Sequence, residues 1–399
     1  MRWPSFFRKK IGVKDNNVES AVKNGSPMKS ELLGDDRADK QNDSKGEQGV
    51  NSSNVTEVKI KGESPAEDSM PINGETGKVE ESESNSSEDQ SIYSMITSHL
   101  TEGVLPDDFT LGEKYDTGFV PGAKDGIALY HMHPVQWDLE RGARILDALT
   151  CISEEEGTEY VGRIMAHFEA LDNKDSIVRL YDEIIHAIDP QKMNLEAILN
   201  FGDYLISYGV SLLAVKAGLT LLAGFKVPFV EDVCLELGAY EEFTYYAARI
   251  LSNGNWEDGN EKLFRLGKQL HGWGRIHAVA YIKADTQEIK DWLLYHGAEN
   301  EIVPQYSADD CLRKAGVIDR LNAGTSDKEF QAIGRLIEYS LEAGPCPGLS
   351  NPEQLLPCFL NAAKNHPMNR ELIRSIHVWV EENMKNNLEI IKLVDELLG

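Results

Sequence analysis

The stretch LHGWGRIHAVAYI, residues Leu270–Ile282, decides between two folds. A dinucleotide-binding loop has the spacing GxGxxG, follows a β-strand and opens a helix. Gly272 and Gly274 fit that spacing, but His277 stands at the third glycine position. The preceding NEKLFRLGKQL has leucines and a phenylalanine at helical spacing, so no strand leads into the loop. The sequence therefore predicts a turn between two packed helices, where Gly272 ends one helix and Gly274 lies near the start of the next.

The same helical pattern extends over the chain from Trp137 onward. Successive segments of about ten to eighteen residues place apolar side chains at helical spacing, and glycines fall between them. Helices joined by short turns predict an all-α fold of stacked helical hairpins, a HEAT- or armadillo-like superhelix. No strict repeat consensus is present, so a compact irregular helical bundle is the alternative.

Two apolar stretches receive different predictions. Asp125–Trp137, DGIALYHMHPVQW, contains Gly126 and Pro134 and is expected to be extended. Val210–Phe225, VSLLAVKAGLTLLAGF, is interrupted by Lys216 and is shorter than the roughly 20 residues of a membrane span. It is expected to be a buried central helix.

Composition divides the chain at about residue 110. Residues 1–110 are rich in Ser, Asn, Asp, Glu and Lys and poor in aromatic residues, which predicts a long disordered N-terminal tail. Residues 111–399 form the predicted helical domain. The formal net charge of −26 repels phosphate backbones, so nucleic acid is not an expected partner.

The tail begins with a basic and aromatic segment, MRWPSFFRKKIGVK, at residues 1–14. Its aromatic residues alternate with Arg and Lys, as in interfacial membrane anchors. A single short segment binds membranes only marginally, so membrane contact is expected to be weak at most, and an ordinary basic terminus is the other interpretation. The five cysteines form no CxxC pair, which favours buried thiols in a reducing cytoplasm.

Several chemical motifs fail on spacing. His131 and His133 lack a third ligand, and His167 with Glu169 would point to different faces of a helix. Glu183 and His186 form only half of a di-iron pattern. Phosphate-loop, HExxH and GxSxG motifs are absent, and the sequence predicts no metal site and no haem or flavin motif.

The predicted turn remains a candidate binding rim. We expect Trp273, Arg275 and His277 to lie near one edge, with Trp292 on the following helix. Aromatic and arginine side chains together are enriched at binding hot spots. The alternative is a buried tryptophan with capping and solvated neighbours.

The chain also resembles a family of bacterial proteins called limonene hydroxylases. The resemblance covers about residues 126–348 and is carried by segments that include ERGARILDAL, YVGRIMAHFE, NFGDYLISYGVSLLAVKAGLTLLA, GWGRIHAVAYI and TQEIKDWLLYHG. It implies hydroxylation of the monoterpene limonene to carveol and perillyl alcohol, with NAD-linked oxidation of these alcohols to carvone and perillyl aldehyde. The family offers no catalytic motif, so no residue inherits a role.

Two functions are compatible with this sequence. The resemblance implies an oxidoreductase that binds an apolar terpene and uses NAD. The residues by themselves favour a non-catalytic helical scaffold that binds a protein partner on a concave surface.

Overall fold

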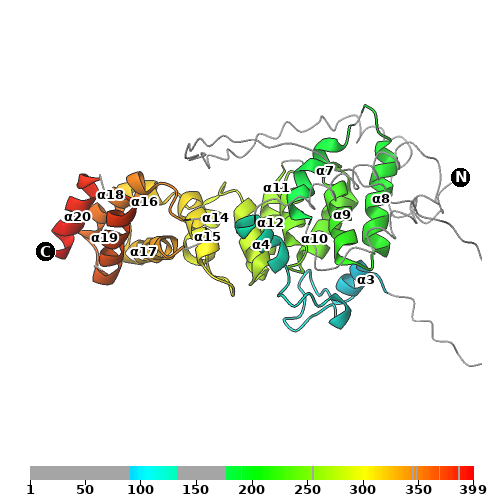
Figure 1. Cartoon of the computed structure of the whole chain (residues 1–399), viewed down its shortest axis with the longest axis horizontal. Coiled ribbons are helices and arrows are strands. Elements are labelled where there is room, and N and C mark those ends of the chain that lie inside the picture. Colours follow the sequence, from blue (N-terminus) through cyan, green and yellow to red (C-terminus); the bar gives the residue numbers. More distant parts are fainter. Residues whose placement is uncertain are drawn as a thin grey trace, which may run out of the picture. The chain divides into compact units, whose positions relative to one another are not determined.

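The described part of this chain is built from helices joined by short connections. A computed structural model describes residues 90–132, 177–189, 191–253, 256–343, 346, 348–367, 369–384 and 387–399 (Figure 1). Within these ranges the only β-type pairing is an isolated bridge between Thr101 and Val104. The predicted all-α class is therefore confirmed. The helices predicted for WDLERGARILDALT and TEYVGRIMAHFEAL lie outside the described residues.

Fourteen α-helices lie in the described part of the chain after residue 176. They are α7 (Tyr181–Ala187), α8 (Leu195–Tyr208), α9 (Leu212–Leu222), α10 (Pro228–Gly238), α11 (Thr244–Ser252), α12 (Gly259–Gln269), α13 (Trp273–Tyr281), α14 (Gln287–His296), α15 (Gln305–Lys314), α16 (Val317–Ala323), α17 (Asp327–Leu341), α18 (Pro352–Ala363), α19 (Arg370–Asn383) and α20 (Leu388–Leu398). Side chains cap the N-termini of six of them, because their oxygens accept the unpaired first amides. The capping residues are Asn194, Ser211, Thr286, Ser326, Asn369 and Asn387.

The helices pack in chain order. Helix α8 packs on α9 and α10 on α11, and farther along α15 packs on α17, α17 on α19 and α18 on α20. Among α7 to α20 the extensive contacts thus join helices one to three positions apart along the chain, which is the arrangement of stacked helical hairpins. Such a stack lets each amphipathic helix bury its apolar face against its neighbours.

Helix α9 is the most deeply buried element. Every residue from Leu212 to Leu222 is buried, including Lys216. This confirms the buried central helix predicted from the apolar run. None of the helices in the described ranges combines the length with the apolar character that a bilayer crossing requires.

The folded part begins earlier than the sequence predicts. Helix α3 (Ile92–Thr97) packs on α8, and its Ile92 and Ile96 are fully buried. Leu111 and Tyr115, which lies in the short helix η1 (Glu113–Tyr115), belong to the same core. The predicted boundary at residue 110 is therefore wrong, since residues 90–110 pack with the helical domain. The tail prediction for residues 1–89 lies outside the described residues.

A second correction concerns Asp125–Trp137. The described part of this stretch is helical, because α4 spans Ala123–His131. Gly126 does not interrupt this helix. It permits close packing on α13, since a Cβ at Gly126 would lie 2.1 Å from ring carbons of Trp273. The prediction of an extended segment treated this glycine as a helix breaker, although its role is set by a side chain far along the chain.

We predict that Gly126→Ala destabilises the protein by about 1–3 kcal/mol, the usual cost of overpacking. The added methyl group must displace the Trp273 ring, which is itself buried. Gly224→Ala is the matched control, because a Cβ at Gly224 meets only the Leu221 carbonyl oxygen at 4.0 Å. Urea denaturation measures both, and equal midpoints for the two variants would contradict the assigned packing.

Candidate functional site

The turn at Gly272 is a helix–turn–helix, as predicted. Helix α12 ends at Gln269, α13 begins at Trp273, and Gly272 is the residue that caps α13. Gly272 has a φ of −107°, so the turn does not need a left-handed residue there. It needs the absence of a side chain, because a Cβ would lie 2.3 Å from Oε2 of Glu241.

The amides of this turn do hold an anion, and the anion is the carboxylate of Glu241. Its Oε1 accepts hydrogen bonds from the backbone N–H groups of His271 at 2.9 Å and Gly272 at 2.7 Å. Its Oε2 accepts from the Gly274 N–H at 3.2 Å. Free amides at a helix N-terminus attract anions, and here they are satisfied within the protein. In a dinucleotide-binding loop these amides would bind a phosphate. Here the Glu241 carboxylate occupies that position, and the sequence pattern did not indicate it.

The predicted rim does not form as an exposed surface. Trp273, Arg275 and His277 are all buried, and only Trp292 is partly exposed. The Trp273 ring packs toward α4 and lies 4.8 Å from the ring of Tyr306. The alternative prediction of a buried tryptophan is the correct one, because Trp273 packs inward against Gly126.

Arg275 makes contacts different from those of its neighbours. Its guanidinium donates to the carbonyl oxygens of Leu270 and His296, both at 3.0 Å, and stacks over the Trp292 ring at 4.9 Å. It thereby satisfies carbonyl groups at the ends of α12 and α14. Arg275 and Trp292 form a pair that joins helix ends, separate from Trp273 and His277.

The charged centre of the protein surrounds Lys216. Its Nζ lies 2.9 Å from Oδ2 of Asp125 and 2.5 Å from Oε1 of Glu242, and each of the three side chains is at most 5% exposed. Burial opposes the charge on Lys216, but the two carboxylates raise the pKa of Lys216 well above its ordinary value. The lysine is therefore a cation held in a salt bridge and is unsuited to act as a nucleophile.

Two carboxylates against one ammonium leave a negative excess in this cluster. The N-terminus of α4 offsets it, since the Gly122 N–H donates to Oε2 of Glu242 at 2.6 Å. Gly122 has a φ of 79°, and a Cβ there would lie 2.7 Å from the Glu241 carbonyl oxygen. Consecutive residues Glu241 and Glu242 thus each cap a different helix.

His277 borders the charged cluster as a neutral imidazole. Burial lowers the pKa of His277 to about 4, although the charge of Asp125 and a hydrogen bond with the Gly122 backbone oppose that shift. Its Nε2 is buried and has no hydrogen-bond partner in the described part of the chain. Burial, with a further contribution from Asp125, also raises the pKa of the neighbouring Tyr246 hydroxyl. These groups stay uncharged near neutral pH and serve as packing residues.

The other sequence candidates lie elsewhere. His131 is exposed at the end of α4, where its Nε2 lies 2.5 Å from the Tyr306 hydroxyl. His186 is exposed on α7, and nothing is described of the Glu183 side chain. His133, His167 and Glu169 are outside the described residues. No group of three His, Cys, Asp or Glu side chains suited to a metal occurs among the residues that the structure describes.

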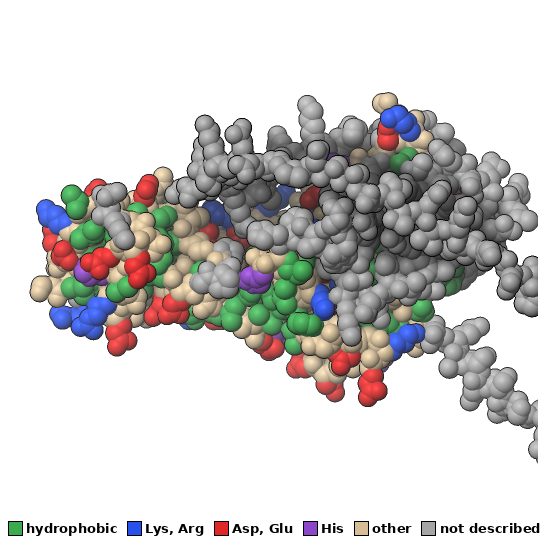
Figure 2. Space-filling model, in the orientation of Figure 1, with side chains coloured by type: hydrophobic (Ala, Val, Ile, Leu, Met, Phe, Trp, Pro, Cys, Tyr) green, Lys and Arg blue, Asp and Glu red, His purple; other side chains and the backbone are tan. Residues whose placement is uncertain are grey.

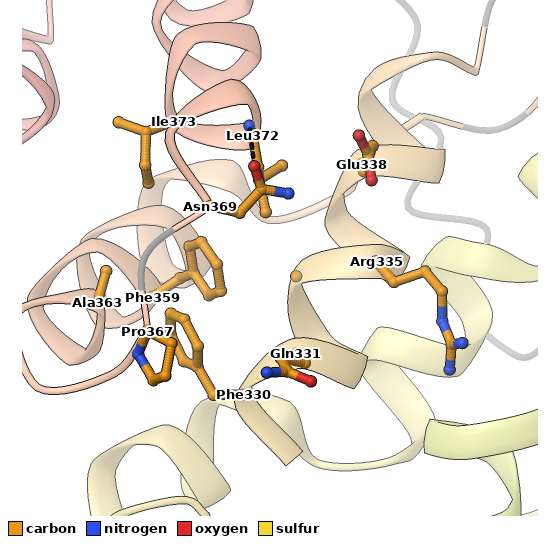
Figure 3. Close-up of a pocket in the computed structure, with 11 residues that line it drawn as sticks. Phe330, Gln331, Arg335, Glu338, Phe359, Ala363, Pro367, Asn369, Leu372 and Ile373 are labelled. Atoms are coloured by element: carbon orange, nitrogen blue, oxygen red, sulfur yellow. Dashed lines mark hydrogen bonds between the residues drawn. The ribbon is translucent and has the colours of Figure 1, made fainter. Parts of the chain in front are cut away.

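An apolar pocket opens between α17, α18 and α19 (Figure 3). Its volume is about 220 Å³, and its apolar lining consists of Phe330, Gly334, Phe359, Ala363, Pro367, Leu372 and Ile373. The rings of Phe330 and Phe359 stack at 4.6 Å and nearly in parallel. Figure 3 shows Arg335 extending away from these rings, so the interior of the pocket is apolar and its charge is at the margin. The sequence pattern did not indicate this pocket, since both phenylalanines occupy ordinary core positions in the helical pattern.

Comparisons with known proteins do not assign this chain to a family. No protein-family model matches the chain, and searches of curated proteins and of solved structures find no similar protein. The resemblance to limonene hydroxylases therefore stays a prediction.

We predict that Glu241→Ala lowers the free energy of unfolding by about 2 kcal/mol, because three amides lose a charged acceptor. The vacated amides should then bind an added anion. Sulfate should raise the melting temperature of this variant more than that of the parent. Glu261→Ala, at an exposed position of α12, controls for the general effect of sulfate. Equal sulfate responses in both variants would show that the amides form no anion site.

We predict that His277 makes stability depend on pH between about 6.5 and 4. The unfolded imidazole takes up a proton near pH 6.5, whereas the folded one does so only near pH 4. Stability is therefore fully present above pH 6.5 and is lost as pH falls, by on the order of 3 kcal/mol.

The variant His277→Gln should lose this part of the pH dependence, although its stability at pH 7 also falls because ring packing is lost. His186→Gln is the control, since His186 is exposed. Urea denaturation at a series of pH values gives the slopes. If the unfolding free energy of the His277→Gln variant depended on pH as steeply as that of the parent, the pH dependence could not be assigned to His277.

Proposed function

We propose that this chain is a non-catalytic scaffold of stacked helical hairpins that takes an apolar side chain of a partner polypeptide into the α17–α19 pocket. The observation that carries the proposal is the pocket itself. It is open at the surface, its floor is two stacked phenylalanine rings, and polar side chains such as Gln331 and Glu338 border it. Protein interfaces commonly place one aromatic or aliphatic anchor in such a pocket, inside a polar margin.

The size of the pocket supports an anchor of one side chain. An engineered apolar cavity of roughly 150 Å³ binds benzene, so a pocket of about 220 Å³ has room for an aromatic ring. Figure 2 shows acidic side chains distributed over the visible face of the described residues, with Lys and Arg scattered among them. This distribution supports a polypeptide partner rather than a nucleic acid. Four cysteines of the described part are free thiols, which agrees with a cytoplasmic setting.

The same pocket gives the resemblance to limonene hydroxylases a second proposal. A monoterpene is a small apolar molecule, and the lining of Phe330, Phe359 and Leu372 is suited to one. Hydroxylation would also need dioxygen, an oxygen-activating centre and a two-electron reductant such as NADH, and the dehydrogenation would need NAD as hydride acceptor. Gas chromatography of the purified chain incubated in air with limonene, NADH and NAD tests this second proposal, together with an absorbance spectrum and metal and flavin analysis. Formation of carveol or perillyl alcohol would favour it over the scaffold.

We predict that a neutral naphthalene dye, N-phenyl-1-naphthylamine, binds this pocket and fluoresces. Ala363→Leu fills the pocket and should weaken dye binding at least tenfold. Asn361→Leu adds the same side chain at an exposed position of the same helix, outside the pocket lining, and should leave binding unchanged. If Ala363→Leu unfolds at a much lower urea concentration than the parent, Gln331→Trp replaces it in the test. Its indole ring should cover the pocket from the exposed margin. Unchanged dye binding in both folded pocket variants would refute the proposed site.

A further inference from the structure

We infer that the occupant of this pocket is the chain's own N-terminal segment, residues 1–14, which competes with external partners. The inference rests on the proposed function, because it assigns an aromatic anchor to the same pocket. Three observations support it: the aromatic content of the segment, its charge, and the length of chain that connects it to the helical domain.

Aromatic residues before residue 90 are confined to this segment. Trp3, Phe6 and Phe7 are the aromatic residues among the first 89, and the next is Tyr93 in α3. A pocket whose apolar lining includes Phe330, Phe359 and Leu372 accepts an aromatic side chain by apolar burial. No other part of the sequence 1–89 offers such an anchor.

Charge favours the same pairing. Residues 1–14 contain five basic residues and no acidic one, namely Arg2, Arg8, Lys9, Lys10 and Lys14. The three helices of the pocket carry seven acidic and four basic residues, and the lining itself contains one residue of each charge, Glu338 and Arg335. The whole chain has a net charge of −26, so this segment is attracted to the body of its own protein.

The connection is long enough and keeps the segment at high local concentration. Residues 15–89 separate it from the first described helix, and a stretch of that length reaches on the order of 250 Å when fully extended. A tethered segment meets its site at an effective concentration that is roughly millimolar for short flexible linkers and falls as the linker lengthens beyond the distance that it must span. A contact that is weak between separate molecules can therefore be well occupied within one chain.

The test uses the naphthalene dye and the full-length chain. Trp3→Ser, Phe6→Ser and Phe7→Ser are combined in one variant, which should bind the dye at least fivefold more tightly than the parent. The control combines Val50→Ser, Val55→Ser and Val58→Ser, which remove apolar side chains from the connection, and should bind as the parent does. A synthetic peptide of residues 1–14 should displace the dye from the triple-aromatic variant.

The outcomes separate this inference from the proposed function. If Ala363→Leu weakens dye binding but the triple-aromatic variant binds as the parent does, the pocket is real and its assigned occupant is wrong. If the segment variant instead loses only binding to vesicles of phosphatidylserine and phosphatidylcholine, the segment is a membrane anchor and the inference fails. Tighter dye binding in the segment variant, reversed by Ala363→Leu, establishes occupation by residues 1–14.

Discussion

The buried charge of Lys216 constrains more of this structure than any other single group. It lies on a helix whose every residue is buried, so it must be neutralised inside the protein. Asp125 reaches it from α4, and Glu242 reaches it from the connection between α10 and α11. Removing one partner of such a cluster typically costs about 3–5 kcal/mol, because the remaining charges stay buried without compensation. The salt bridge thus ties α4 to α9, since Asp125 must meet the lysine.

The pair Glu241 and Glu242 explains why glycines surround this centre. One carboxylate accepts the first amides of α13 and the other accepts the Gly122 amide of α4. Both contacts bring side-chain or backbone oxygen to positions that a Cβ at Gly122 or Gly272 would occupy. The glycine spacing that resembles a nucleotide fingerprint is thus produced by packing around internal carboxylates. A GxG pattern indicates close approach to an anion, and only the surrounding structure tells whether that anion is a ligand.

Sequence reasoning succeeded where the decisive interactions are local. Helical periodicity and missing strand character predicted the class, the buried helix α9 and the turn after Gln269. It failed where the decisive partner lies far along the chain. Gly126 is interpreted as a helix breaker until the Trp273 ring is placed on it, and the sequence pattern leaves open whether Trp273 is buried or lies at a rim. The sequence did not predict the pocket, because Phe330 and Phe359 occupy buried positions of the helical pattern. That pattern does not distinguish a fully packed core from one that contains a cavity.

The charged cluster around Lys216 and the α17–α19 pocket lie on different sets of helices. Lys216 belongs to α9 and the two glutamates to the connection between α10 and α11, whereas the pocket belongs to α17, α18 and α19. Extensive contacts in the described helices link near neighbours in the chain, so energetic coupling between the two regions must pass through several interfaces in turn. Substitutions that far apart, with no shared partner, usually act additively. The charged centre can therefore fix the fold of its own helices without altering the lining of the α17–α19 pocket.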